Sequence, residues 1–176
     1  MILLVAATEA ELCGHGGLVC GVGPVEAAAA TARTLALDPP GAVLHVGIAG
    51  GRGLEPGTLV VGAEAVYVDI AAAVPVVSRV VPDRALLSAV TAALPDALAL
   101  PIWTSAAVGR LGSDPVVEAM EGFAVLRACA LAGVPAAEVR AISNEIGEED
   151  RSRWQTGRAL DALAAAIPRL LAAAGE

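Results

Sequence analysis

Short apolar runs alternate with longer segments of helical periodicity along most of the chain. Strands that alternate with helices are typical of a sheet whose strands are mostly parallel and whose two faces are covered by helices. The sequence therefore predicts a three-layer α/β/α sandwich with a mixed, mostly parallel central sheet, in a single domain of residues 1–176. Strands are expected at residues 1–7, 18–20, 42–46, 59–61, 65–69, 101–107, 116–120 and 137–143, and helices at 25–37, 83–94, 123–132 and 152–174.

Proline and glycine mark several ends of these elements. Pro24 suits the first position of a helix, where a backbone N–H would have no partner, and the prolines after Asp38 stop that helix. The glycine-rich residues 47–51 follow a predicted strand, and we expect them to form a loop that a ligand can approach closely. Pro168 is expected to kink the last helix.

The charge of the chain limits its partners. All 11 basic side chains are Arg, and 19 acidic residues bring the net charge to −8. Proteins that bind nucleic acid need a basic surface, so nucleic acid is not an expected partner. No uncharged run reaches the roughly 20 residues of a membrane span, and the N-terminal apolar run lacks the basic start of a signal peptide. We therefore expect a soluble, cytoplasmic protein, and its 56% hydrophobic content suits a homo-oligomer.

The cysteines give no sign of a metal site. Cys13, Cys20 and Cys129 are odd in number and lack metal-ligand spacing, and only His15 and His45 accompany them. Reduced, buried thiols are the simpler interpretation. The sequence predicts neither a bound metal ion nor a cofactor.

Three polar side chains stand next to apolar segments that we expect to be strands. Glu11 follows the first strand, Glu121 separates strand 116–120 from a helix, and Asn144 follows strand 137–143. In an open α/β sheet such strand ends meet at one edge and build a site. A carboxylate can accept hydrogen bonds from both hydroxyls of a sugar diol, and Asn both donates and accepts, as a purine edge requires.

Each of these residues also has a simpler interpretation. Glu11 is consistent with a solvated helix start, Glu121 with an ion pair to an arginine, and Asn144 with a helix cap or turn. The segment Gly21-Val22-Gly23 before a helix matches half of a dinucleotide-binding fingerprint, but the third glycine is missing. An NAD site therefore stays open only as an alternative to a tight turn.

Taken together, the motifs resemble those of the purine nucleoside phosphorylase and nucleosidase family. The resemblance implies a nucleoside phosphorylase-like fold and cleavage of the N-glycosidic bond of a purine nucleoside. Residues 143–154 are most similar to futalosine hydrolases, which are nucleosidases of the menaquinone pathway. The matching segments are residues 6–11 (AATEAE), 21–28 (GVGPVEAA), 47–51 (GIAGG), 120–122 (MEG) and 139–144 (VRAISN).

The resemblance also implies roles for individual residues. Glu11 would orient and deprotonate the attacking water, and Asn144 would face N7 and O6 of the purine. Glu121 would hold the ribose 2′- and 3′-hydroxyls, with Met120 against the sugar. The other substrate contacts that the resemblance implies are Ile48, Ala49, Gly50, Val108 and Gly109.

Two departures from the family pattern narrow the expected reaction. Adenine-specific nucleosidases carry Asp at the position of Asn144; an Asn cannot act as an acid, but it can accept from N7–H and donate to O6 of a 6-oxopurine. Bacterial phosphorylases place Arg and Ser where this chain has His45 and Ile48, so phosphate would lose a cation and a donor. Hydrolysis of a 6-oxopurine nucleoside is expected.

The expected substrate is futalosine, which would yield hypoxanthine and dehypoxanthine futalosine. Residues 69–76, where relatives cover the substrate, are compressed and apolar, which would suit a bulky aromatic 5′ substituent. Three alternatives stay open: a nucleosidase for methylthioadenosine or S-adenosylhomocysteine, a purine nucleoside phosphorylase, and a non-catalytic nucleoside-binding module.

Overall fold

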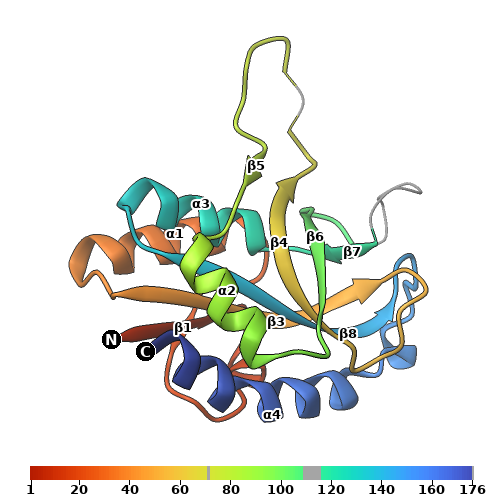
Figure 1. The fold of residues 1–176 in the computed structure, drawn as a ribbon. Helices are drawn as coiled ribbons and strands as arrows, with labels where there is room; N and C mark the ends of the chain where they lie inside the picture. Colours follow the sequence, from red (N-terminus) through yellow and green to blue (C-terminus); the bar gives the residue numbers. More distant parts are fainter. Residues whose placement is uncertain (71, 109–115, 176) are drawn as a thin grey trace.

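The computed structural model describes residues 1–70, 72–108 and 116–175 (Figure 1). A central sheet lies between two pairs of helices, and two short 3-10 turns precede β2 and α4. The strands are β1 (Ile2–Ala6), β2 (Leu18–Val19), β3 (Ala42–Gly51), β4 (Leu59–Tyr67), β5 (Arg79–Val80), β6 (Leu98–Thr104), β7 (Val117–Ala119) and β8 (Ala136–Glu145). The helices are α1 (Pro24–Leu37), α2 (Arg84–Ala93), α3 (Gly122–Ala132) and α4 (Thr156–Gly175), and the 3-10 turns are η1 (Glu9–Leu12) and η2 (Arg151–Arg153).

The helices cover the sheet in two separate layers. Helices α1 and α3 pack together on one face, where Val43 and Val125 belong to a buried apolar cluster (Figure 1). Helices α2 and α4 cover the other face, where Leu44, Val90 and Ile167 belong to a second cluster. Neighbouring residues of a strand point to opposite faces of the sheet, so Val43 and Leu44 of β3 pack against different helix layers. The predicted α/β/α sandwich is confirmed.

The sheet partly closes on itself. Its strand order is β2-β1-β3-β7-β6-β4-β5, and β8 pairs with both β3 and β4. The pairs β1–β2, β1–β3, β3–β8, β4–β6 and β6–β7 are parallel, and the pairs β3–β7, β4–β5 and β4–β8 are antiparallel. The sheet is therefore mixed and mostly parallel, as expected. Because β3, β8, β4, β6 and β7 form a closed ring of pairings, the end of β7 lies beside β3 and near the end of β8.

The prediction of a loop at residues 47–51 is wrong, because these residues continue β3. Gly47 pairs with Arg140 of β8, and Gly50 pairs with Glu118 of β7 and Asn144 of β8. A Cβ atom added at Gly47 would overlap Nη1 of Arg140. The glycines therefore let large neighbouring side chains approach the strand, instead of marking a turn.

Other elements also differ from the prediction. Strand β5 was not expected, and β6 covers residues 98–104 where a strand was expected at 101–107. The strands expected at 59–61 and 65–69 are one strand, β4, whose pairing with β6 is irregular between Gly62 and Glu64. The helix expected at 152–174 begins only at Thr156, after η2, and it continues through Pro168. Helix α3 ends just before Gly133, whose φ of +70° is the left-handed conformation that glycine often adopts at the C-terminus of a helix.

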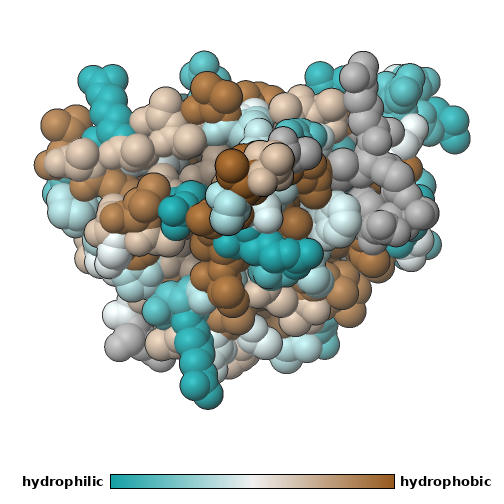
Figure 2. Space-filling view, turned by 90° about the horizontal axis from the view of Figure 1, so that it is seen from above, coloured by the Kyte–Doolittle hydropathy of each residue, from teal (hydrophilic) through white to brown (hydrophobic). Residues whose placement is uncertain are grey.

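The segment between β4 and β5 projects from the body of the protein (Figure 1). Val74, Val76 and Val77 of this segment are exposed. Figure 2 looks down on the side from which the segment projects and shows hydrophobic side chains over much of this face. Among the described helices, none combines the length and apolar character needed to cross a bilayer.

Candidate active site

A cavity of about 300 Å³ opens where β1, β7 and β8 end, beside the glycine-rich half of β3. Its volume lies at the lower end of the range of roughly 300–1,000 Å³ that is typical of small-molecule sites. Gly109, which the sequence also indicated, lies outside the described residues. Every other residue indicated by the sequence lines this cavity: Glu11, Ile48, Ala49, Gly50, Val108, Met120, Glu121 and Asn144.

Glu11 is held in place by three hydrogen-bond donors. Its Oε2 atom accepts from the backbone N–H of Thr8 at 3.0 Å and from the Thr8 hydroxyl at 2.7 Å. Its Oε1 atom accepts from the backbone N–H of Ile48 in β3 at 3.0 Å. The side chain is buried although η1 is a surface turn. Glu11 is therefore a fixed carboxylate on the cavity wall and not a solvated helix start.

Glu121 connects the end of β7 to the first turn of α3. Its Oε1 atom accepts from the backbone N–H of Gly23 at 3.0 Å, and its Oε2 atom lies 3.5 Å from Nη2 of Arg140. The expected alternative, an ion pair with an arginine, is thus present together with the cavity position. Gly21 and Gly23 have positive φ angles of +84° and +95°, which favour glycine. The Gly23 N–H is directed at a carboxylate and not toward a dinucleotide phosphate.

Asn144 lies within β8, so it is neither a helix cap nor a turn residue. Its Oδ1 atom accepts from the Ser143 hydroxyl at 2.7 Å, and its Nδ2 atom donates to the carbonyl of Glu145 at 3.0 Å. A primary amide has two N–H donors and two acceptor lone pairs. The protein uses one of each, which leaves one donor and one acceptor for a ligand.

A buried ionic cluster beneath the cavity was missed by the sequence reasoning. Arg140 of β8 is fully buried; its Nε atom donates to Glu138 Oε1 at 2.7 Å, and its Nη2 atom lies 2.5 Å from Nε2 of His45. The Nδ1 atom of His45 lies 3.1 Å from the carbonyl of Val5. Because a carbonyl can only accept, the imidazole proton is on Nδ1 and Nε2 accepts from the arginine.

The electrostatics of the cluster keep Arg140 positive and His45 neutral. Burial, reinforced by the charge of Arg140, lowers the pKa of His45 well below its usual value. Burial also opposes the charge on Arg140, but Glu138, Glu121 and Glu11 outweigh it and raise the pKa of the guanidinium. Burial raises the pKa of Glu138 even though Arg140 acts in the opposite direction. The cluster thus places a permanent cation below two cavity carboxylates.

One terminal nitrogen of this buried cation lies beside Gly47, close to Glu11. Nη1 of Arg140 has no hydrogen-bond partner among the described residues. The position that a Cβ on Gly47 would occupy overlaps Nη1 and lies 2.7 Å from Glu11 Oε1, so both atoms face the same small space. The sequence held one signal of this arrangement. Glu138 and Arg140 are two residues apart in an apolar strand and therefore share a face.

A second part of the cavity wall comes from the segment between β8 and α4. Arg151 and Trp154 line the cavity, and the Arg151 guanidinium lies 5.1 Å from the centre of the Trp154 ring. The indole N–H of Trp154 donates to the carbonyl of Glu148 at 2.9 Å. In the sequence, this segment was indicated only by its similarity to futalosine hydrolases. Glu118 of the short strand β7 also lines the cavity, and no sequence signal indicated it.

Cysteine and metal chemistry are not indicated by the described residues. Burial raises the pKa of Cys20 to about 11 and that of Cys129 to about 12, so both remain protonated thiols at neutral pH. The described chain brings together no group of three or more His, Cys, Asp and Glu side chains that could hold a metal ion. The chemistry that the site offers is that of carboxylates, an amide and an arginine.

Comparison with known proteins places this arrangement among enzymes that act on nucleosides. The family model of the phosphorylase superfamily matches residues 5–174. A futalosine hydrolase of Streptomyces coelicolor is 36% identical over 180 residues, covering 87% of this chain and 77% of that protein. A futalosine hydrolase of Thermus thermophilus is 52% identical over 59 residues, covering 34% of this chain and 26% of that protein.

Solved structures share the fold. A 5′-methylthioadenosine/S-adenosylhomocysteine nucleosidase from Colwellia psychrerythraea, in complex with adenine, superposes with a TM-score of 0.84. The two chains are 21% identical, and the match covers 98% of this chain and 94% of the other. At this identity the likeness establishes the arrangement of strands and helices.

Proposed function

The chain belongs to the phosphorylase superfamily, and we propose that it is a nucleosidase that hydrolyses the N-glycosidic bond of futalosine, releasing hypoxanthine and dehypoxanthine futalosine in menaquinone biosynthesis. The convergence of Glu11, Glu121 and Asn144 on one cavity is the observation that carries this proposal. The names of the two relatives support futalosine as the substrate.

Glu121 binds the ribose in this mechanism. Its oxygens accept hydrogen bonds from the 2′- and 3′-hydroxyls, and Met120 lies against the sugar. Cleavage of an N-glycosidic bond builds positive charge on the ribose. A carboxylate already fixed by Gly23 and Arg140 stabilises that charge without having to reorganise.

Glu11 acts as the general base that activates water. Such a base typically contributes a factor of about 10²–10⁴ to the rate. Its carboxylate is fixed by Thr8 and Ile48, and Nη1 of Arg140 faces the same space. A water molecule in the cavity can donate a hydrogen bond to Glu11, which leaves a lone pair of its oxygen free to attack the anomeric carbon.

Asn144 binds the leaving purine. The lone pair that remains on its Oδ1 accepts from N7–H, and the remaining N–H donates to O6. This pattern stabilises hypoxanthine as it departs and leaves polar groups unpaired with adenine. Selection of a 6-oxopurine follows from the hydrogen bonds that the protein itself makes to the amide.

The environment of His45 and Ile48 favours hydrolysis over phosphorolysis. His45 stands where related phosphorylases place an arginine, and here it is buried and bonded to Val5 and Arg140. Ile48 replaces a serine, and its backbone N–H is occupied by Glu11. Neither position supplies the cation or hydroxyl that would bind phosphate.

We also propose that residues 1–176 act as one domain, because residues from Ala7 to Leu160 line a single cavity. The exposed valines between β4 and β5 support a homo-oligomer. Three free cysteines suit a reducing, cytoplasmic environment.

Incubation with futalosine, inosine and methylthioadenosine, each with and without phosphate, tests the proposed reaction. We expect hypoxanthine from futalosine at a rate that does not depend on phosphate. Faster release of adenine from methylthioadenosine would refute the assignment of Asn144, and a requirement for phosphate would identify a phosphorylase. Binding without turnover, unchanged by Glu11→Gln, would identify a binding module.

A further inference from the structure

We infer that Arg151 and Trp154 form a subsite for an aromatic carboxylate and that Arg151 selects nucleosides whose 5′ substituent carries one. The inference rests on the proposed function, because the subsite is part of the same cavity. With the purine at Asn144 and the diol at Glu121, the wall that neither uses includes η2 and the start of α4, where Arg151, Trp154 and Leu160 line the cavity.

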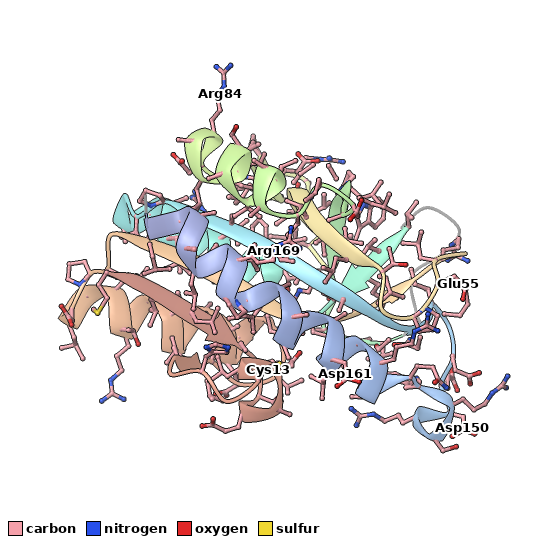
Figure 3. All side chains as sticks on the ribbon, turned by 60° about the horizontal axis from the view of Figure 1, so that its bottom comes forward. Cys13, Glu55, Arg84, Asp150, Asp161 and Arg169 are labelled. Atoms are coloured by element: carbon pink, nitrogen blue, oxygen red, sulfur yellow. The ribbon has the colours of Figure 1, made fainter. Side chains whose placement is uncertain are left out.

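The start of α4 lies on the side of the cavity that carries the general base. The carbonyl of Leu160 is 3.6 Å from Sγ of Cys13, which directly follows η1. Figure 3 shows Cys13 close to Asp161 of α4, with Asp150 at the outer end of the segment that leads into this helix. Arg151 follows Asp150 and is exposed, so its guanidinium is at the mouth of the cavity.

The Trp154 ring is fixed in orientation. Its N–H is bonded to the Glu148 carbonyl, so the ring cannot turn without breaking that hydrogen bond. The Arg151 guanidinium lies over the ring at 5.1 Å from its centre, a cation–π contact. A guanidinium that contacts an aromatic ring through its face keeps its in-plane N–H groups available. These groups match the two oxygens of a carboxylate.

The charge of Arg151 has no counterpart among the described carboxylates. Arg153 of the same turn forms an ion pair with Glu148 at 3.1 Å, whereas Arg151 forms no ion pair with any described residue. Among the described residues that line the cavity, Arg151 is the only cation.

The cavity is lined by acidic side chains, so a single arginine decides whether an anionic substituent can bind. Glu11, Glu118 and Glu121 line the same cavity, and the chain has a net charge of −8. An anionic substituent would be repelled there unless it reached a positive group. The indole face and the guanidinium together therefore define the ligand as an aromatic ring with a carboxylate.

Futalosine and its methyl ester test this directly, because futalosine ends in a benzoate and the two compounds differ in that one charge. We expect the wild-type protein to favour the acid over the ester by at least about tenfold in kcat/KM, as a hydrogen-bonded ion pair would. Arg151→Gln should bring the ratio close to one. Arg153→Gln removes the same charge from the same turn and should keep the wild-type ratio. An unchanged ratio in Arg151→Gln would overturn the inference.

Binding measurements separate this inference from the proposed reaction. In protein carrying Trp103→Phe and Glu11→Gln, Trp154 is the remaining tryptophan, and its fluorescence reports ligands that stack on it. Preference for the acid that depends on Arg151, without hydrolysis by wild-type protein, would support the subsite and refute the reaction. Hydrolysis of futalosine without a preference that depends on Arg151 would support the reaction and refute the subsite. Binding of neither compound would refute the subsite.

Discussion

The guanidinium of Arg140 lies 3.5 Å from the carboxylate of Glu121, and both side chains are buried. The second oxygen of Glu121 is bonded to the Gly23 N–H. The carboxylate that is proposed to hold the ribose is therefore oriented before any substrate arrives. This preorganisation depends on a cation that is itself held by Glu138 and His45.

Replacing Arg140 should reveal the cost of an uncompensated buried charge. Arg140→Met leaves Glu138 buried without its partner, and we expect a loss of about 3–5 kcal/mol in the free energy of unfolding. The double variant with Glu138→Met should recover most of that loss, because both charges are then removed. Urea denaturation of the two single variants and the double variant measures the coupling. Additive losses would contradict the ion pair.

The stability of the protein should depend on pH through His45. Its pKa is lowered in the folded protein, so the unfolded chain binds more protons below the usual value of 6.5. Stability is then fully present above pH 6.5 and falls with decreasing pH, by up to about 1.4 kcal/mol per pH unit.

His45→Gln should remove this contribution while keeping an acceptor for Arg140. Urea denaturation at pH 7.5 and 5.5 should show a smaller loss in the variant than in the wild type. His15→Gln provides the matched control and should keep the wild-type slope. Equal slopes for wild type and His45→Gln would show that His45 does not titrate differently in the two states.

Gly47→Ala tests the close approach of Arg140 and Glu11. The new methyl group would overlap Nη1 of Arg140 and stand 2.7 Å from Glu11 Oε1. Displacement of catalytic groups by about 1 Å can cost on the order of a hundredfold in rate, and we expect a loss of that size in kcat. Gly16→Ala adds the same methyl group where nothing lies within 4 Å, so its kcat should match the wild type. A wild-type rate for Gly47→Ala would exclude this geometry.

Asn144→Asp should change the preferred base. The variant carboxyl can protonate N7, and it loses the N–H that faces O6 of a 6-oxopurine. We expect the ratio of inosine to methylthioadenosine cleavage to fall by at least about tenfold. Chromatography of the released bases measures the ratio. An unchanged ratio would show that Asn144 does not read the purine.

Much of the fold was predictable because its signals are local. The apolar run that became β1 and the Pro24 that begins α1 depend only on neighbouring residues. The continuation of β3 through residues 47–51 was not predictable in this way. Glycine has a low strand propensity, and these glycines are tolerated because Arg140 and Ile142 fill the space beside them.

The residues of the candidate site also differ in whether local sequence signals indicate their position. Glu11, Glu121 and Asn144 stand at strand ends or next to them, so their convergence follows from the topology of the sheet. The contact between His45 and Arg140 joins residues 95 positions apart, and no pattern within either strand encodes it. The position of Arg151 over Trp154 depends likewise on how η2 folds back toward the cavity.

The central claim, that Glu121 binds the ribose of a nucleoside that is cleaved by water, is tested most directly by the rate of hypoxanthine release from futalosine in phosphate-free buffer. Wild-type protein should turn over. Glu121→Gln should lose on the order of a thousandfold in kcat/KM while it remains folded by circular dichroism. A folded Glu121→Gln protein with a rate close to that of the wild type would contradict the account.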